Sequence, residues 1–163
     1  GTGLCPSARG SQSWAVRDHA SALGPGKRPR LTPNPALAIR PGKSVMPFGT
    51  PGGDNQNQAN VQVLLNMELF GMTPQEATEA PRFMTHSQPN SFSPHEAYPG
   101  KLTVEGRVDE ATTDALSGRG HDVERLPDLT WKTAGVCLVR KDLKSGIIDS
   151  GADPRRPSRA MGR

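Results

Sequence analysis

The longest helical pattern of apolar and polar positions runs from Gln56 to Phe70. Its polar residues Gln58, Gln62 and Asn66 recur every four positions and form one stripe, while apolar side chains cover most of the remaining circumference. A helix that is apolar over so much of its surface is buried on several sides, so we expect it to pack on a sheet within a larger body. Asp54 stands where a side chain caps the first turn of such a helix.

Short strands and helices surround this segment. The apolar runs 36–39 and 45–48 flank a Pro-Gly turn and predict a hairpin. Thr73, Pro74 and Glu76 supply a cap, a proline at the first helical position and a capping box, so a short helix begins there and ends before Pro81. The chain then shows, in order, a strand at 102–105, a helix at 109–119, and strands at 121–126, 133–141 and 147–150. The pattern predicts a fold of mixed helices and strands.

Three segments lack this periodicity. Residues 1–34 carry strong turn signals and several prolines, which is typical either of a linker or of an ordered loop that lines a site. Residues 82–101 form a polar loop whose His86 and His95 lack the spacing of metal ligands on a helix, so we expect no metal site. Residues 151–157 are rich in turn signals and are expected to be exposed.

The stretch 49–54, Gly-Thr-Pro-Gly-Gly-Asp, connects an expected strand to the long helix. Adjacent Gly52 and Gly53 allow positive φ angles and leave no Cβ in the way of a ligand. Their N–H groups stand at the positive end of the helix dipole, which favours an anion site or an oxyanion hole. From these six residues alone, a tight turn in which glycine only relieves backbone strain is preferred, because lone glycine motifs are weak signals. Phosphate is disfavoured, because no Lys or Ser/Thr follows the glycines and Asp54 would repel it.

Composition and charge limit the size of the core and the kinds of partner that we expect. The 163 residues amount to one domain or a piece of a larger one. Apolar residues are only 33% while there are 18 Gly and 16 Pro, so the core is thin and we expect the chain to be part of a larger fold. The net charge of +4 is scattered, and the basic clusters 27–30 and 155–156 have no interleaved aromatics. Both clusters are interpreted as solvated loops, and no nucleic-acid partner is expected.

The two cysteines are far apart in sequence and form no metal-binding spacing. Cys137 lies in the apolar run 136–139 and is interpreted as an inert buried thiol, and a disulfide with Cys5 is possible but not indicated. No apolar run approaches the roughly 20 residues that a membrane helix needs. No cofactor motif is present, and the sequence assigns no compartment.

Several motifs together resemble one family. They are Gly49–Asp54 followed by Gln58 and Leu64-Leu65-Asn66, Pro25–Pro29 with Asn34-Pro35-Ala36, Glu79-Ala80-Pro81-Arg82, Val104–Arg107 and Gly151–Arg155. In this combination they resemble the gamma-glutamyltranspeptidases, also called glutathione hydrolases. The resemblance covers essentially the whole chain.

The resemblance implies the α+β fold of an N-terminal-nucleophile hydrolase, an αββα sandwich of two sheets between helical layers. Residues 1–163 would form its C-terminal part, with 1–34 as a loop-rich segment that lines the site and 35–163 as part of the sandwich. A precursor would cleave itself into a large and a small subunit, and the new N-terminal Thr of the small subunit, upstream of this chain, would be the nucleophile. The expected partners are the large subunit, the missing N-terminal part of the small subunit, a γ-glutamyl or related amide, and water or an amino-acid acceptor.

The resemblance also assigns roles to residues. Gly52 and Gly53 would form the oxyanion hole, which reverses the preference for a simple turn. Arg9 and Gln12 match positions where well-studied members carry acidic residues for the substrate amine, and Leu31-Thr32 match a pair of serines. Without the acidic anchor, we expect another γ-glutamyl compound or a different acyl amide rather than glutathione. The alternative function is a catalytically inactive relative that acts as an interaction or binding module.

Overall fold

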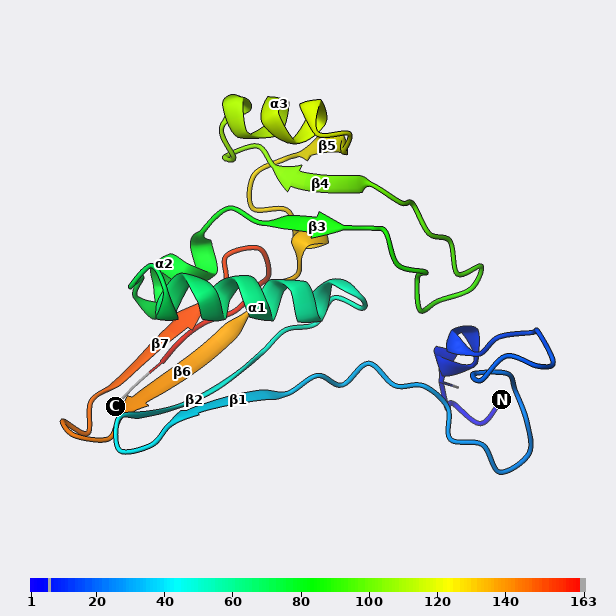
Figure 1. Ribbon diagram of the computed structural model, residues 1–163. Coiled ribbons are helices and arrows are strands. Elements are labelled where there is room, and N and C mark those ends of the chain that lie inside the picture. The colour runs from blue at the N-terminus through cyan, green and yellow to red at the C-terminus, as the bar shows by residue number, and fades with distance from the viewer. Residues whose placement is uncertain (6, 162–163) are drawn as a thin grey trace.

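The computed structural model describes residues 1–5 and 7–161 and shows two sheets joined by helices, with an extended N-terminal segment to one side (Figure 1). The larger sheet is antiparallel in the order β1-β2-β6-β7. Its strands are β1 (Ala36–Arg40), β2 (Ser44–Gly49), β6 (Cys137–Asp142) and β7 (Ile148–Ala152). The expected β1–β2 hairpin is confirmed, and Gly42 in its turn has a φ of 67°.

Two helices cover one face of this sheet: α1 (Asn55–Glu68) and α2 (Pro74–Glu79) (Figure 1). The capping box of α2 is confirmed, because Thr73 Oγ1 accepts from the Glu76 N–H and Glu76 Oε2 accepts from the Thr73 N–H at 2.8 Å. Only one side of α1 is buried, whereas Val61 and Leu65 on its other side are exposed. Burial of α1 on several sides is therefore not seen among the described residues.

The smaller sheet has the order β3-β4-β5. Its elements are β3 (Phe83–Thr85), β4 (Lys101–Glu105), α3 (Glu110–Gly118) and β5 (Asp122–Leu126). Strands β4 and β5 are parallel and are connected through α3, which confirms the expected strand–helix–strand unit. Asp109 caps α3 by accepting from the Thr112 N–H at 2.8 Å.

Strand β3 corrects the expectation of a continuous polar loop over 82–101. The polar stripe of α1 hydrogen-bonds to the backbone edge of β3 that is not paired with β4. The side-chain amide of Gln62 donates to Phe83 O and accepts from the Phe83 N–H. The amide of Gln58 makes the same pair of bonds with the backbone of Thr85. The side-chain amides thus replace a neighbouring strand, and this long-range pairing has no signature in the sequence of β3 itself.

The apolar core lies between α1, α2 and the inner face of the larger sheet. It consists of Met46, Ala59, Val63, Met67, Ala77, Met84, Ala134, Val136 and Leu138. Because side chains alternate along a strand, the residues between these core positions face away from the helices. That outer face exposes apolar side chains: Leu37, Ile39, Pro47, Val139 and Ile148.

Cys137 also belongs to the outer face, since it precedes the inward-facing Leu138, and its thiol is exposed. This corrects the interpretation of Cys137 as a buried thiol. The apolar residues around Cys137 in the sequence suggested burial. Side chains alternate between the two faces of a strand, however, so only every second residue of this run faces the core.

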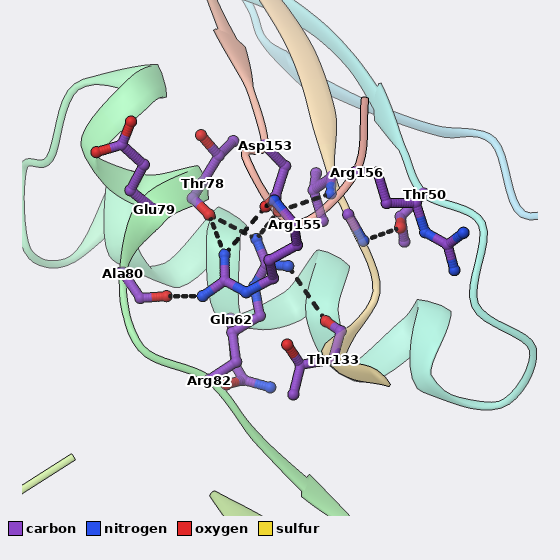
Figure 2. A network of polar contacts seen from close by, with 12 residues as sticks. Thr50, Gln62, Thr78, Glu79, Ala80, Arg82, Thr133, Asp153, Arg155 and Arg156 are labelled. Atoms are coloured by element: carbon purple, nitrogen blue, oxygen red, sulfur yellow. Dashed lines mark hydrogen bonds and ion pairs between the residues drawn. The ribbon is translucent and has the colours of Figure 1, made fainter. Parts of the chain in front are cut away.

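The expectation of an exposed tail at 151–157 is also wrong. Asp153 and Arg155 are almost fully buried beneath α2, where they meet Arg82 (Figure 2). Arg155 donates to both carboxylate oxygens of Glu105 at 2.6 Å, and its Nη1 lies 3.1 Å from Asp153 Oδ1. Arg82 Nη2 lies 2.5 Å from Asp153 Oδ2. The chain does turn at this segment, as the sequence indicates, but the turn is buried and its charged side chains form ion pairs with the core.

The four charges balance inside the fold, because two guanidiniums face two carboxylates. Burial alone raises the pKa of Glu105, but hydrogen bonds from Arg155 and Thr133 outweigh it, so the pKa of Glu105 lies below its usual value. Arg155 also donates to the carbonyl oxygens of Thr78 and Ala80 at the end of α2. The network therefore joins β4, α2 and the segment after β7.

We predict that Glu105→Gln destabilises the protein by about 3–5 kcal/mol, because Arg155 then stays buried without its main counter-charge. Urea unfolding measures the change. The matched control on the same strand pair is Glu124→Gln, which removes the exposed bridge to Lys101 and is expected to cost less than about 1 kcal/mol. Equal effects of the two variants would contradict a special role for the buried network.

Candidate active site

The glycine turn lies where the sequence predicts, between the end of β2 at Gly49 and the start of α1 at Asn55. Gly52 has a φ of 145° and Gly53 a φ of 57°, conformations that L side chains rarely adopt. Among residues 1–5 and 7–161, no atom accepts a hydrogen bond from the N–H of Gly52 or Gly53. The two adjacent donors stay available for a ligand.

The turn is fixed from the side of the loop before β6. The N–H of Gly135 donates to Thr50 Oγ1 at 2.8 Å, and the side-chain amide of Asn55 donates to Lys132 O at 2.8 Å. A Cβ on Gly52 would lie only 2.9 Å from the Cβ of the fully buried Ala134. Gly52 therefore serves a second purpose, because it lets the turn approach this loop.

A groove of about 680 Å³ opens in front of the turn. Gly52 and Gly53 line it together with the start of α1 and much of the 85–98 segment. His86 is among its lining residues, and its Nε2 lies 3.0 Å from Thr103 Oγ1. Burial, followed by the charge of Lys101, lowers the pKa of His86, so the imidazole is neutral at neutral pH.

Asp54 occupies the N-cap position of α1, but its side chain makes no capping bond. This corrects the expectation that the carboxylate caps the helix. With φ −72° and ψ −13°, Asp54 already has helical geometry, whereas a capping side chain usually requires an extended backbone. Its Oδ2 instead accepts from the Ser91 N–H at 2.7 Å and holds the 85–98 segment against the turn.

Three of the four expected substrate-binding residues lie together. Arg9 Nη1 donates to Thr32 Oγ1 at 2.6 Å and lies 3.4 Å from Gln12 Oε1. Gln12 is fully buried and reaches Ser91 Oγ, so this cluster continues to the residue that Asp54 holds. Leu31 is exposed and lies outside these contacts. None of the four lines the groove at the glycine turn.

Segment 1–34 is an ordered loop rather than a free linker. It contains the short 3₁₀ helix η1 (Ala8–Gln12), and Ser11 O accepts from the Ser93 N–H at 2.7 Å. The ring of Trp14 stacks between His19 and His95, with centroid separations of 4.0 and 4.2 Å.

Arg30 is the groove residue that sequence reasoning missed. The basic run 27–30 was interpreted as a solvated loop, and Arg30 is indeed exposed, but it lines the groove with Gly52 and Gly53. The only sequence signal was its place just before the Leu31-Thr32 pair.

No cluster of three or more His, Cys, Asp or Glu side chains arranged for a metal ion occurs in the part of the chain that the structure describes. Within that same part, no helix is long and apolar enough to cross a bilayer.

Comparisons with known proteins place these features in a family. A family model described as gamma-glutamyltranspeptidase matches residues 5–163. The chain is 33% identical over 161 residues to the glutathione hydrolase-like YwrD proenzyme of Bacillus subtilis, which covers 99% of this chain and 29% of that protein. It is 32% identical over 162 residues to the oxamate amidohydrolase proenzyme of Klebsiella pneumoniae, again covering 99% and 29%.

A solved structure of gamma-glutamyltranspeptidase from Pseudomonas nitroreducens, complexed with L-DON, shares the fold. Its TM-score is 0.75 at 21% identity, and the match covers 100% of this chain and 83% of that chain. The chain thus spans 29% of the length of the two curated relatives but most of this one solved chain.

We predict that Asp54→Ala loosens the 85–98 segment, because the Ser91 N–H loses a charged acceptor worth about 1.5–3 kcal/mol at most. Hydrogen exchange at the Ser91 amide should become about tenfold faster or more. Asp18→Ala removes the same charge from an exposed residue of segment 1–34 and should leave this amide unchanged. An unchanged exchange rate in Asp54→Ala would show that the segment is held by other contacts.

Proposed function

The chain belongs to the gamma-glutamyltranspeptidase family, and we propose that it supplies the oxyanion hole and part of the acyl groove of an enzyme that cleaves γ-glutamyl or related acyl amides. Its α+β fold is that of the N-terminal-nucleophile hydrolases, and the family hydrolyses or transfers acyl groups from amide bonds. The observation that carries the proposal is the pair of unpartnered N–H groups at Gly52 and Gly53 in the wall of a groove.

The proposed reaction is a two-step acyl transfer. The hydroxyl oxygen of an N-terminal Thr bonds to the amide carbonyl carbon, and its proton passes to the α-amine of the same Thr. The negative charge that develops on the carbonyl oxygen is stabilised by the N–H groups of Gly52 and Gly53. The C–N bond then breaks as the leaving nitrogen takes the proton, and water or an amino-acid acceptor releases the acyl group from the ester.

The nucleophile of this proposal is outside the 163 residues. The proposed arrangement makes residues 1–163 the C-terminal part of a small subunit, in which 1–34 line the site and 35–163 belong to the sandwich. It is supported by alignments that cover 99% of this chain but 29% of the two curated relatives, both of which are named proenzymes. The 163 residues alone would then be inactive, and the large subunit would be a partner.

The uncovered outer face of the larger sheet supports such a partner. Exposed Leu37, Ile39, Val139 and Ile148 give this face an apolar surface with the helices on the opposite side (Figure 1). In an αββα sandwich this face packs against the second sheet, which removes its apolar side chains from water. Cys137 would then be buried at the interface between sheets rather than in the core of this chain.

The proposed substrate is an acyl amide other than glutathione. Arg9 stands at a position where the family resemblance implies an acid, and it is held by Thr32 and Gln12. The two curated relatives are named for different amides, glutathione and oxamate, which supports a family scaffold that accepts more than one acyl group.

We predict that Gly53→Ala lowers kcat by about 10²–10³, because a Cβ strains the backbone at a φ of 57° and relief of that strain turns an oxyanion donor away. Release of p-nitroaniline from acyl anilides by the complete gene product measures the rate. Gly71→Ala is the matched control: its φ is 67°, a Cβ there meets no atom within 4 Å, and it lies outside the groove. Similar rate losses in both variants would mean that backbone strain, not lost donation, is responsible. Absence of turnover in the complete wild-type protein would instead favour the non-catalytic binding module.

We predict that Val139→Asp prevents association of this chain with the second sheet, because a carboxylate cannot be buried unpaired at that interface. Size-exclusion chromatography of the co-expressed subunits measures association. Leu143→Asp is the control, since Leu143 is 45% exposed in the β6–β7 turn while Val139 is 43% exposed on the outer face. Association that survives Val139→Asp would argue against this face as the partner surface.

A further inference from the structure

The charged side chains that line the groove differ in whether they already have a hydrogen-bond partner. Its lining contains one guanidinium, Arg30, and two carboxylates, Asp54 and Glu96. Asp54 accepts from the Ser91 N–H, and Glu96 accepts from the Tyr98 hydroxyl at 2.5 Å. Arg30 has no hydrogen bond or ion pair with any atom of residues 1–5 and 7–161. A free cation therefore shares the groove with the two free backbone donors.

A second cleft of about 260 Å³ adjoins the groove at Arg30, which lines both. Among the described residues, the other charged residues of this cleft are Lys27 and Arg28, and none of its lining residues is a carboxylate. Lys27 is already bound, because its ammonium donates to the carbonyl oxygens of Ala20 and Ala22. The surroundings of Arg30 on this side are thus entirely positive, which raises the local preference for an anion.

The neighbouring cluster also contains a cation. Arg9 donates to Thr32, two residues after Arg30, and within residues 1–5 and 7–161 no carboxylate pairs with it. A substrate ammonium would meet the guanidinium of Arg30, with Arg28 in the adjoining cleft, whereas a substrate carboxylate would find in Arg30 an unpaired fork of N–H donors.

We propose that the groove selects acyl amides whose acyl part ends in a carboxylate and carries no ammonium, the monoamides of dicarboxylic acids, with Arg30 as the specificity-determining anchor. The proposal rests on the proposed function of Gly52 and Gly53 for the position of the reacting carbonyl. The turn and Arg30 line the same groove, and the acyl chain would lie between them. Arg30 binds the substrate and takes no part in the proton transfers.

Three anilides that differ in one charge each test the proposal on the complete gene product. They are glutaryl p-nitroanilide, its γ-glutamyl analogue, which adds only an α-ammonium, and its methyl ester, which removes the carboxylate charge. We expect kcat/KM for the glutaryl anilide to exceed both others by at least tenfold. A γ-glutamyl anilide or methyl ester that reacts as fast as the glutaryl anilide would overturn the proposal.

Substitution of Arg30 tests whether its own contact with the substrate carboxylate matters or only the total positive charge of the protein. Arg30→Gln should lower kcat/KM for the glutaryl anilide at least tenfold, chiefly through KM, and change the methyl ester less than threefold. Arg17→Gln removes the same charge from an exposed residue that lines neither the groove nor the cleft, and should leave both substrates within twofold. Equal losses in the two variants, or none in Arg30→Gln, would show that Arg30 is not the anchor.

Binding tests the anchor without catalysis. Isothermal titration should show that glutarate binds the wild-type protein at least tenfold more tightly than L-glutamate, and that Arg30→Gln removes this preference. If the anilides are not cleaved but glutarate binding depends on Arg30, the proposed reaction fails and the anion-binding role of the groove stands. If Gly53→Ala abolishes anilide turnover while Arg30→Gln alters neither binding nor rate, the proposed reaction stands and the anchor fails.

Discussion

The ion pair between Glu105 and Arg155 is the interaction on which the rest of the structure depends. Both side chains are buried, and together with Asp153 and Arg82 they join β4, the end of α2 and the segment after β7. Buried charges are stable only when each has its partner and its hydrogen bonds, so these elements must be assembled together. Thr133 belongs to the network through Glu105 Oε1 and begins the loop that holds the glycine turn. The geometry of the proposed oxyanion hole is thus fixed from the core.

The second constraint is that neighbouring segments pack directly against the backbone of two glycines. Gly52 leaves room for Ala134, and Gly151 in β7 leaves room for α2, since a Cβ at Gly151 would clash with Pro74 O. Thr50 and Gly135 then complete the attachment of the turn to the loop. Two N–H groups that are held in position before a substrate arrives need little reorganisation when charge develops on a carbonyl oxygen. The same packing explains why small residues occur at these sites independently of any chemistry.

Local signals were sufficient for the parts of the fold that are stabilised locally. The α2 capping box and the β1–β2 hairpin depend on residues a few positions apart, and the glycine turn is marked by adjacent residues; each was found in its expected place. Strand β3, the buried tail and the outward Cys137 depend on partners that are distant in the sequence, which no local pattern records. In the site, the glycines were recognised by their turn chemistry. Arg30 was not, because a basic loop residue has the same sequence signature whether it faces bulk water or a groove.

The two parts of the proposed site are supported by different forces. The glycine turn is attached to a buried network, and disturbing it disturbs the core. Segment 1–34, which carries Arg9 and Arg30, is attached to the 85–98 segment by the buried Gln12–Ser91 contact. Its other attachments are the Ser93–Ser11 hydrogen bond and the stack of Trp14 between His19 and His95. A residue of segment 1–34 can therefore change its charge at little cost in folding free energy. The fold physically separates the donors that would stabilise the reacting oxygen from the cations that would select the acyl group, so substrate preference can differ without loss of the oxyanion hole.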